Sequence, residues 1–433
     1  MNEMADTRTI PCVSRVRGRV AVPGSKSVTH RALILAALSE EECVIENALD
    51  AEDTRITAEA LRRLGVRIHW HGTTIRVRPA PHRWISSPEP LALSNSGTSL
   101  RLLMGLAAVG RGTFVFDGST RLRQRPVGPL ADALKPLGVG VRFLGRDLCP
   151  PLELQTNGLH AGETLVDASE SSQYLSSLLI AATQAEGPVL VRWKDPVASW
   201  PYVTITLSMM TEVGLEFSHV EPRAIRVPAP QRLGGFRLEV EGDCSSASYF
   251  WAASALTRGD VVTYPLHSSS LQGDCRFLEV LASMGCRIQW EDRGVRVQGP
   301  DRLQPVHVDM NTMPDMVPTL AVVCAFADGP CTIGNVAHLR IKESDRLDAV
   351  ATELQRLGVF VEQYPDGLRI QGPPQRGGAI NTYNDHRIAM AFAVLGLKVP
   401  GTMIRGASTV SKSFPEFWAA LHDLLQQSRQ ENA

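Results

Sequence analysis

The sequence lacks most of the features that would tie it to a membrane or to nucleic acid. Lys and Arg number 44 against 45 Asp and Glu, so the formal net charge is -1 and nothing global attracts a polyanion. No run reaches the roughly 18 apolar residues of a membrane span. The first ten residues show no basic-then-apolar signal pattern. We therefore expect no nucleic-acid partner and no membrane association.

The cysteines also show no recognisable motif. None of the eight cysteines forms a C-x-x-C pair, and most lie in apolar surroundings. Buried, reduced thiols are the expectation, which favours a reducing compartment. Heptads and an exposed apolar stripe are also missing. Together these absences predict a cytoplasmic monomer.

A short phrase recurs along the chain. In each copy the end of an amphipathic helix meets a glycine, and strand-like residues follow; the glycines are Gly65, Gly138, Gly214, Gly285 and Gly358, spaced by 71 to 76 residues. Such a glycine is typical of a left-handed helix C-cap. The period indicates a chain built from copies of one unit of about seventy residues.

Each unit also has an earlier helix that is apolar nearly all round and therefore buried. A hairpin follows the repeated glycine. The fold class is thus α/β, an α+β repeat of six β-α-β-α-β-β units. The six buried helices are predicted at 27–38, 97–109, 171–183, 245–256, 315–327 and 385–397.

The sixth unit is incomplete, because no hairpin follows its second helix, predicted at 414–425. Strand-like segments at 9–22 are expected to supply what it lacks. Domain one would then span 23–242 (three units), and domain two would combine 1–22 with 243–433. A single six-unit solenoid is the alternative.

Cations gather at equivalent helix starts in a chain with no excess positive charge. A plain helix N-cap fits most of the clusters taken singly, but it leaves Lys342, Arg346 and Arg387 unexplained. Together the clusters predict a site for small, highly anionic ligands. Packing about a pseudo-threefold in each domain would bring these ends to the interdomain cleft. Two carboxylates, Asp315 and Glu343, lie among the cations, a costly placement unless they move protons. The cations are Lys26, Arg31, Arg125, Lys342, Arg346, Arg387 and Lys412.

At these motifs the chain resembles the enolpyruvyl transferases, most closely the branch that acts on shikimate 3-phosphate. The resemblance spans nearly the whole chain in order. The residues that carry it are Pro23-Gly-Ser-Lys-Ser-x-x-x-Arg31, Asn95-Ser-Gly-Thr98, Arg125-Pro126, Ser171-Ser-Gln173, Glu241-Gly-Asp-Cys-Ser-Ser-Ala-Ser-Tyr249, Lys342-Glu-Ser-Asp-Arg346, Asn384-Asp-His-Arg387 and Ser411-Lys-Ser-Phe-Pro415.

The resemblance implies two domains of three units each and transfer of the enolpyruvyl group of phosphoenolpyruvate to the 5-hydroxyl of shikimate 3-phosphate, with release of phosphate. It also implies that no metal or organic cofactor takes part. The residues implied to line the phosphoenolpyruvate site are Lys26, Gly97, Arg125, Gln173, Arg346, Arg387 and Lys412. Those implied to hold shikimate 3-phosphate are Lys26, Ser27, Arg31, Ser171, Ser172, Gln173, Ser199, Tyr202, Asp315 and Lys342.

The chemistry of addition and elimination fits these residue types. Glu343 is predicted to donate the proton to the methylene carbon, and Asp315 with Lys26 to accept the proton of the attacking hydroxyl. The arginines would stabilise the departing phosphate. His338 stands where many members have an asparagine that contacts shikimate 3-phosphate, and it is left out of the predicted site.

Two rival functions are kept. A sister enzyme loads enolpyruvyl onto a UDP-amino sugar (UDP-N-acetylglucosamine); most of its members carry a cysteine in a loop of domain one, and here 117–128 contains none. A non-catalytic anion-binding repeat protein would need the cations but not Asp315 and Glu343.

Overall fold

The five repeated glycines all adopt the left-handed backbone that the sequence predicts. In the computed structural model, which describes residues 6–80, 84 and 89–430, their φ angles are 94°, 86°, 83°, 103° and 90°. Only glycine takes such angles without steric cost. The predicted helix ends are therefore confirmed at all five positions.

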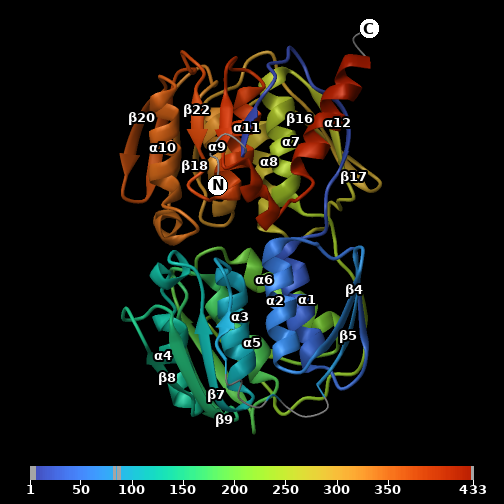
Figure 1. The fold of residues 1–433 in the computed structure, drawn as a ribbon, viewed down its shortest axis with the longest axis vertical. Coiled ribbons are helices and arrows are strands. Elements are labelled where there is room, and N and C mark those ends of the chain that lie inside the picture. Colours follow the sequence, from blue (N-terminus) through green and yellow to red (C-terminus); the bar gives the residue numbers. More distant parts are fainter. Residues whose placement is uncertain (1–5, 81–83, 85–88, 431–433) are drawn as a thin grey trace. The chain divides into compact units, whose positions relative to one another are not determined.

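The chain splits into two compact units. One, here called the central unit, is Gly24–Val240; the other, the terminal unit, combines Met1–Pro23 with Glu241–Ala433. In each unit the helices lie between small sheets (Figure 1).

The central unit has three four-stranded sheets. In each sheet the first two strands are parallel and the last two form an antiparallel hairpin. Their orders are β14 (Arg237–Glu239), β3 (Cys43–Glu46), β5 (Thr74–Arg78), β4 (Arg67–His71); β6 (Leu91–Ala92), β7 (Arg111–Asp117), β9 (Leu152–Asn157), β8 (Gly140–Phe143); and β10 (Gly162–Asp167), β11 (Val189–Lys194), β13 (Ala224–Val227), β12 (Ser218–Glu221).

The terminal unit has two four-stranded sheets and one three-stranded sheet. Their orders are β16 (Arg287–Glu291), β17 (Gly294–Gln298), β15 (Asp260–Tyr264), β2 (Arg17–Ala21); β18 (His307–Asp309), β19 (Cys331–Gly334), β21 (Gly367–Gln371), β20 (Phe360–Tyr364); and β1 (Thr7–Thr9), β23 (Met403–Arg405), β22 (Ala379–Asn381).

The predicted buried helices form the core of each unit. Every residue of α7 is buried, as its apolar sequence requires, and α7, α9 and α11 pack against one another. In the central unit α3 packs against α1 and α5. These helices are α1 (Lys26–Leu38), α3 (Gly97–Ala108), α5 (Ser172–Ala182), α7 (Cys244–Thr257), α9 (Val317–Cys324) and α11 (His386–Gly396).

The second helices leave a larger share of their residues partly or fully exposed than the buried helices do, and α2, α10 and α12 are strongly amphipathic. They are α2 (Glu52–Arg63), α4 (Gly128–Leu134), α6 (Pro201–Glu212), α8 (Phe277–Ser283), α10 (Arg346–Arg356) and α12 (Phe417–Gln430). Short 3-10 turns accompany both sets: η1 (Leu122–Gln124), η2 (Lys135–Leu137), η3 (Gly273–Arg276), η4 (Pro314–Met316), η5 (Ala337–Ile341) and η6 (Ala407–Lys412).

The fifth buried helix differs from its prediction. Instead of one helix over 315–327, the 3-10 turn η4 carries Asp315, and α9 begins only at Val317. Proline explains the break, because Pro314 and Pro318 each lack a backbone N–H donor and are tolerated only near helix starts. Asp315 therefore sits on a tight turn, ahead of the helix proper.

The N-terminal strands join two different sheets. β1 pairs with β23 and completes the sixth unit, as predicted. The prediction is wrong for β2, which runs parallel to β15 in the sheet of the fourth unit. At the other crossing, β14 pairs with β3 in the sheet of the first repeat. β2 and β14 are thus the last strands before the chain passes from one compact unit to the other, and each completes a sheet of the compact unit that the chain is about to leave.

Cysteine pairing also differs from expectation. Cys43, Cys149, Cys286, Cys324 and Cys331 are buried and free, but Cys244 and Cys275 form a disulfide. It joins the first turn of α7 to η3, two segments that only the tertiary fold brings together. No helix of the described residues is long and apolar enough to cross a membrane.

Candidate functional site

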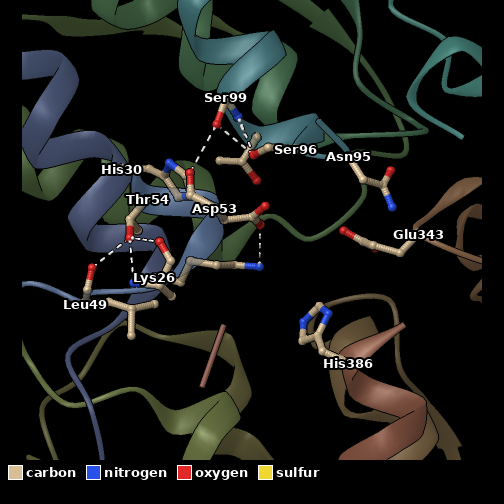
Figure 2. Close-up of polar contacts among 12 residues, drawn as sticks. Lys26, His30, Leu49, Asp53, Thr54, Asn95, Ser96, Ser99, Glu343 and His386 are labelled. Carbon is tan, nitrogen blue, oxygen red and sulfur yellow. Dashed lines mark hydrogen bonds and ion pairs between the residues drawn. The ribbon is translucent and has the colours of Figure 1, made fainter. Parts of the chain in front are cut away.

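Lys26 and Asp53 form an ion pair at the helix starts of the first unit. Lys26 opens α1, and its Nζ lies 3.3 Å from Asp53 Oδ2 in the first turn of α2 (Figure 2). The Lys26 side chain is 14% exposed and that of Asp53 only 2%. A buried carboxylate at this distance orients the ammonium group. The predicted site omits Asp53. The available signal was its acidic side chain in the first turn of the helix that follows the Lys26 cluster in the same repeat.

Gly97 provides a bare surface for Arg125. A Cβ atom on Gly97 would lie 2.6 Å from Arg125 Cζ, so only glycine lets the guanidinium approach the first turn of α3 so closely. Arg125 Nη1 also donates to the carbonyl of Asn95 at 3.2 Å, and Arg125 is 3% exposed. The guanidinium is thus held beside the amino end of α3, where the helix dipole also favours an anion.

Gln173 is fixed by its contacts with α3. Its Nε2 donates to Thr98 Oγ1 at 3.0 Å, and its Oε1 accepts from Arg101 Nη1 at 2.9 Å. Ser171 caps α5 by accepting from the Gln173 backbone N–H, and Ser172 is 3% exposed in the first turn. The predicted trio therefore lies at one helix start. Arg101 is a further member, which the predicted site leaves out because its signal in the sequence is weak.

Arg31 is locked inside the central unit. Its guanidinium donates to Thr206 Oγ1 at 2.7 Å, to the Ser27 carbonyl at 2.9 Å, and to Ser176 Oγ and the Tyr202 carbonyl at 3.2 and 3.0 Å. The Arg31 side chain also lies over the Tyr202 ring. Burial lowers the pKa of Arg31 to about 10, so it is still cationic at neutral pH. Ser199, with a φ of 57°, lies in the turn before α6.

Arg346 is the centre of a carboxylate cluster in the terminal unit. It is 1% exposed at the start of α10. Its Nη1 donates to Asp315 Oδ1 at 2.8 Å, its Nη2 to Glu343 Oε2 at 2.9 Å, and its Nε to Asp385 Oδ2 at 2.8 Å. Burial acts against the charge, but Asp385, Glu343 and Asp315 together raise the pKa of Arg346 above its usual value.

Asp315 is shared between two arginines. Its second oxygen accepts from Arg387 Nη2 at 2.7 Å, in the first turn of α11. Arg387 is 4% exposed and also contacts Ser245 Oγ at 3.4 Å. Asp385 caps α11 by accepting from the Arg387 backbone N–H while it binds Arg346. The structure thus brings Asp315, Glu343, Arg346 and Arg387 together as one charged cluster.

The two remaining predicted cations, Lys342 and Lys412, also lie in the terminal unit. Lys342 is partly buried at the end of η5, next to Glu343, and Lys412 closes η6 with 6% exposure. His338, left out of the prediction, is 7% exposed on η5; burial, and then Lys342, lowers its pKa to about 3.

Asp274 is a buried acid behind the cluster that no sequence pattern singled out. Its Oδ2 accepts from Ser245 Oγ, which in turn faces Arg387. Burial raises the pKa of Asp274 to about 6, and the nearby charge of Asp315 adds to the effect. Among the described residues no group of three or more His, Cys, Asp or Glu side chains is arranged so that it could hold a metal ion.

Each unit, taken by itself, places cations and hydrogen-bond donors at the starts of buried helices. On an α/β repeat fold, this arrangement is typical of proteins that bind small phosphorylated anions.

The family comparison makes the assignment specific. Residues 11–421 match the family described as EPSP synthase (3-phosphoshikimate 1-carboxyvinyltransferase). The chain therefore belongs to the EPSP synthase family, transferases of the shikimate pathway to the aromatic amino acids.

Individual relatives agree along nearly the full length. A 3-phosphoshikimate 1-carboxyvinyltransferase of Syntrophobacter fumaroxidans is 54% identical over 421 residues, covering 96% of this chain and 99% of the relative. One from Methanosphaerula palustris is 44% identical, with 92% and 95% covered. EPSP synthase from Acinetobacter baumannii superposes with a TM-score of 0.80 at 28% identity, covering 96% of this chain and 98% of that one. The fold predicted from the repeats is confirmed.

Proposed function

We propose that this protein transfers the enolpyruvyl group of phosphoenolpyruvate to the 5-hydroxyl of shikimate 3-phosphate and releases phosphate. The observation that carries the proposal is the buried cluster in which Arg346 and Arg387 share Asp315 while Arg346 also holds Glu343. A scaffold that only binds anions would need the arginines but not the two carboxylates that pair with them, and removing one partner of a buried pair costs on the order of 3–5 kcal/mol.

The arginines serve the anionic groups of phosphoenolpyruvate. Planar guanidinium groups bind carboxylate and phosphate through paired hydrogen bonds. The residues that bind this substrate are Lys26, Gly97, Arg125 and Gln173 of the central unit and Arg346, Arg387 and Lys412 of the terminal unit. As phosphate departs, these fixed donors stabilise the charge that develops on its oxygens.

Shikimate 3-phosphate is held by the hydroxyl-rich helix starts of the central unit and by Asp315 and Lys342 of the terminal unit. Ser171, Ser172 and Gln173 present hydroxyl and amide groups at the start of α5. Arg31 orders the surroundings of Ser27 and Tyr202 through hydrogen bonds to both backbone carbonyls.

Asp315 and Glu343 move the protons. Glu343 donates to the methylene carbon of phosphoenolpyruvate, and Asp315 with Lys26 accepts the proton of the 5-hydroxyl. Both carboxylates share Arg346. A substrate anion that takes over guanidinium donors removes positive charge from these carboxylates and so favours their protonated forms. Substrate binding and proton transfer are thereby coupled.

The deciding experiment is phosphate release from phosphoenolpyruvate. Release that depends on shikimate 3-phosphate, with none in a parallel reaction containing UDP-N-acetylglucosamine, is the expected result. Release with the sugar nucleotide alone would overturn the acceptor assignment in favour of the sister enzyme.

A matched variant separates the enzyme from a non-catalytic anion binder. Glu343→Gln keeps the size of the side chain and its acceptor for Arg346, but it cannot donate a carboxylic proton. Turnover should fall by at least about 100-fold while phosphoenolpyruvate still binds in the presence of shikimate 3-phosphate, measured by calorimetry. Unchanged turnover would remove Glu343 from the mechanism.

The expected cytoplasmic location and monomeric state stay predictions from the sequence. Light scattering of the purified protein at micromolar concentration gives its mass and tests the monomer directly.

A further inference from the structure

A buried chain of hydrogen bonds joins three helices of the central unit. His30 Nδ1 on α1 lies 2.8 Å from Thr57 Oγ1 on α2, which lies 2.7 Å from Ser99 Oγ on α3. Ser99 Oγ in turn lies 2.7 Å from Ser96 Oγ, the N-cap of the same helix (Figure 2). All four side chains have 0% exposure. Polar groups are costly to bury, so such a chain needs every link intact.

Each of these residues lies close to a residue that is proposed to bind phosphoenolpyruvate or to pair with one that does. His30 is one helical turn after Lys26, and Thr57 is one turn after Asp53, the partner of Lys26. Ser96 directly precedes Gly97, against which Arg125 is packed. Ser99 Oγ also reaches the Asp53 carbonyl at 3.4 Å, a second tie between α2 and α3.

We propose that Thr57 is a positioning residue for phosphoenolpyruvate binding. Its single hydroxyl meets a side chain on α1 and another on α3, so it sets how the start of α1, with Lys26, lies relative to the start of α3, with Gly97 and Arg125. The inference rests on the proposed function. Thr57 itself touches no substrate; it acts through the helices whose ends do.

Loss of this chain of hydrogen bonds should have a different effect from loss of ordinary core packing. Losing apolar contacts lowers stability wherever it occurs, whereas losing this hydroxyl releases two helix starts from each other. A small displacement of binding groups costs affinity steeply, and about a tenfold rise in the KM for phosphoenolpyruvate is expected. The kcat should change less, because Lys26 is the one group assigned to proton transfer that would be displaced, and Asp315 and Glu343 of the terminal unit are untouched.

Two substitutions at position 57 separate these effects. Thr57→Val keeps the shape of the side chain and removes the hydroxyl. Thr57→Ser keeps the hydroxyl and removes a methyl group, which leaves a small cavity. Both should lower the Tm, but only Thr57→Val should raise the KM for phosphoenolpyruvate, and Thr57→Ser should keep the wild-type value.

Thr156→Val is the matched control in the same unit. The Thr156 hydroxyl is also buried and donates to the Ala108 carbonyl at 2.8 Å, at the other end of α3 from the chain described here. This variant should lose stability and retain the wild-type KM. Should Thr57→Val not fold, Ser99→Ala breaks the same chain between α2 and α3 and is measured in its place.

The outcomes are distinct. A wild-type KM in Thr57→Val, or equal rises in Thr57→Val and Thr57→Ser, would overturn the positioning role while leaving the enzyme assignment intact. Wild-type protein that releases no phosphate with shikimate 3-phosphate would overturn the proposed function and this inference together.

Discussion

Arg346 makes more ion pairs than any other residue of the charged cluster in the terminal unit. Its guanidinium meets Asp315, Glu343 and Asp385, each through a different nitrogen, while its side chain is 2% exposed. Three acids around one buried cation form a network whose members are each stabilised only while the cation stays in place. Asp385, with 0% exposure, depends on it most.

Arg346→Lys should therefore damage both stability and activity. Lysine keeps the charge but cannot present donors in three directions within one plane. We expect a loss of about 3 kcal/mol in the free energy of unfolding, measured in urea, and a fall of at least about 100-fold in kcat/KM.

The matched control is Arg192→Lys. Arg192 also lies between two acids, Glu163 and Glu221, but on the surface. Such exposed pairs contribute at most about 1 kcal/mol, so activity should be unchanged. Equal effects of both substitutions would show that burial of the cluster is unimportant.

His338 should make stability depend on pH. Burial, followed by the charge of Lys342, lowers its pKa from 6.5 to about 3. Below pH 6.5 the unfolded chain therefore takes up a proton that the folded protein refuses until about pH 3. The contribution of neutral His338 to stability is complete above pH 6.5 and is lost progressively as the pH falls toward 3.

His338→Gln should flatten this dependence. Each pH unit in the window is worth up to about 1.4 kcal/mol, so urea unfolding of wild type and variant should diverge between pH 6.5 and 4.5. His69→Gln, at an exposed position on β4, should follow the wild type. Parallel curves for the wild type and His338→Gln would mean that His338 is protonated in the folded protein.

At the scale of elements, the disulfide joins α7 to the turn η3, next to the charged cluster that contains Arg346 and Arg387. Ser245 and Asp274, which hydrogen-bond to each other, are the immediate chain neighbours of Cys244 and Cys275. The covalent link therefore holds in place the two segments that face Arg387. The sequence alone favoured reduced thiols, because nothing in its spacing marks this pair.

Thiol titration tests the pairing. Protein purified without reductant and unfolded in guanidinium should show six reactive thiols, and eight after reduction. Closing a segment with a sequence separation of 31 should stabilise the oxidised protein by about 3–4 kcal/mol in the chain-entropy account. Eight thiols before reduction would rule out the disulfide in the isolated protein.

At the scale of the whole molecule, the two units differ in how they are assembled from the chain. The central unit is one continuous segment, Gly24–Val240, and contains every strand of its three sheets. The terminal unit needs both ends of the chain, because β1 and β2 each supply an outer strand to a sheet otherwise made by residues after Glu241.

Fragments should reflect this difference. A fragment of residues 24–240 should fold alone, with cooperative thermal unfolding seen by circular dichroism. A fragment of residues 241–433 should not, because two of its sheets lose a strand and leave backbone groups unpaired. Co-expression with residues 1–23 should restore folding. A stable 241–433 fragment would show that β1 and β2 are dispensable.

The repeats and their helix starts could be predicted from the sequence because they depend on local signals. A glycine in the left-handed cap, an apolar helix and a polar cap each act within a few residues. The prediction of one continuous fifth helix over 315–327 was wrong because an equally local signal, Pro318, was outweighed by the apolar pattern around it. The list of candidate cations could also be predicted, since their positions follow the repeat.

The sequence did not predict which residues these side chains contact, because contacts between distant segments depend on packing. Arg346 meets Asp385 across 39 residues, and Arg31 meets Thr206 across 175. The sequence by itself determined where the six units lie and which helix starts carry charge, because local periodicity and capping encode both. Only the tertiary structure decided which acid each arginine binds, which sheet β2 joins and which cysteines pair, because those choices depend on how the buried helices and sheets pack.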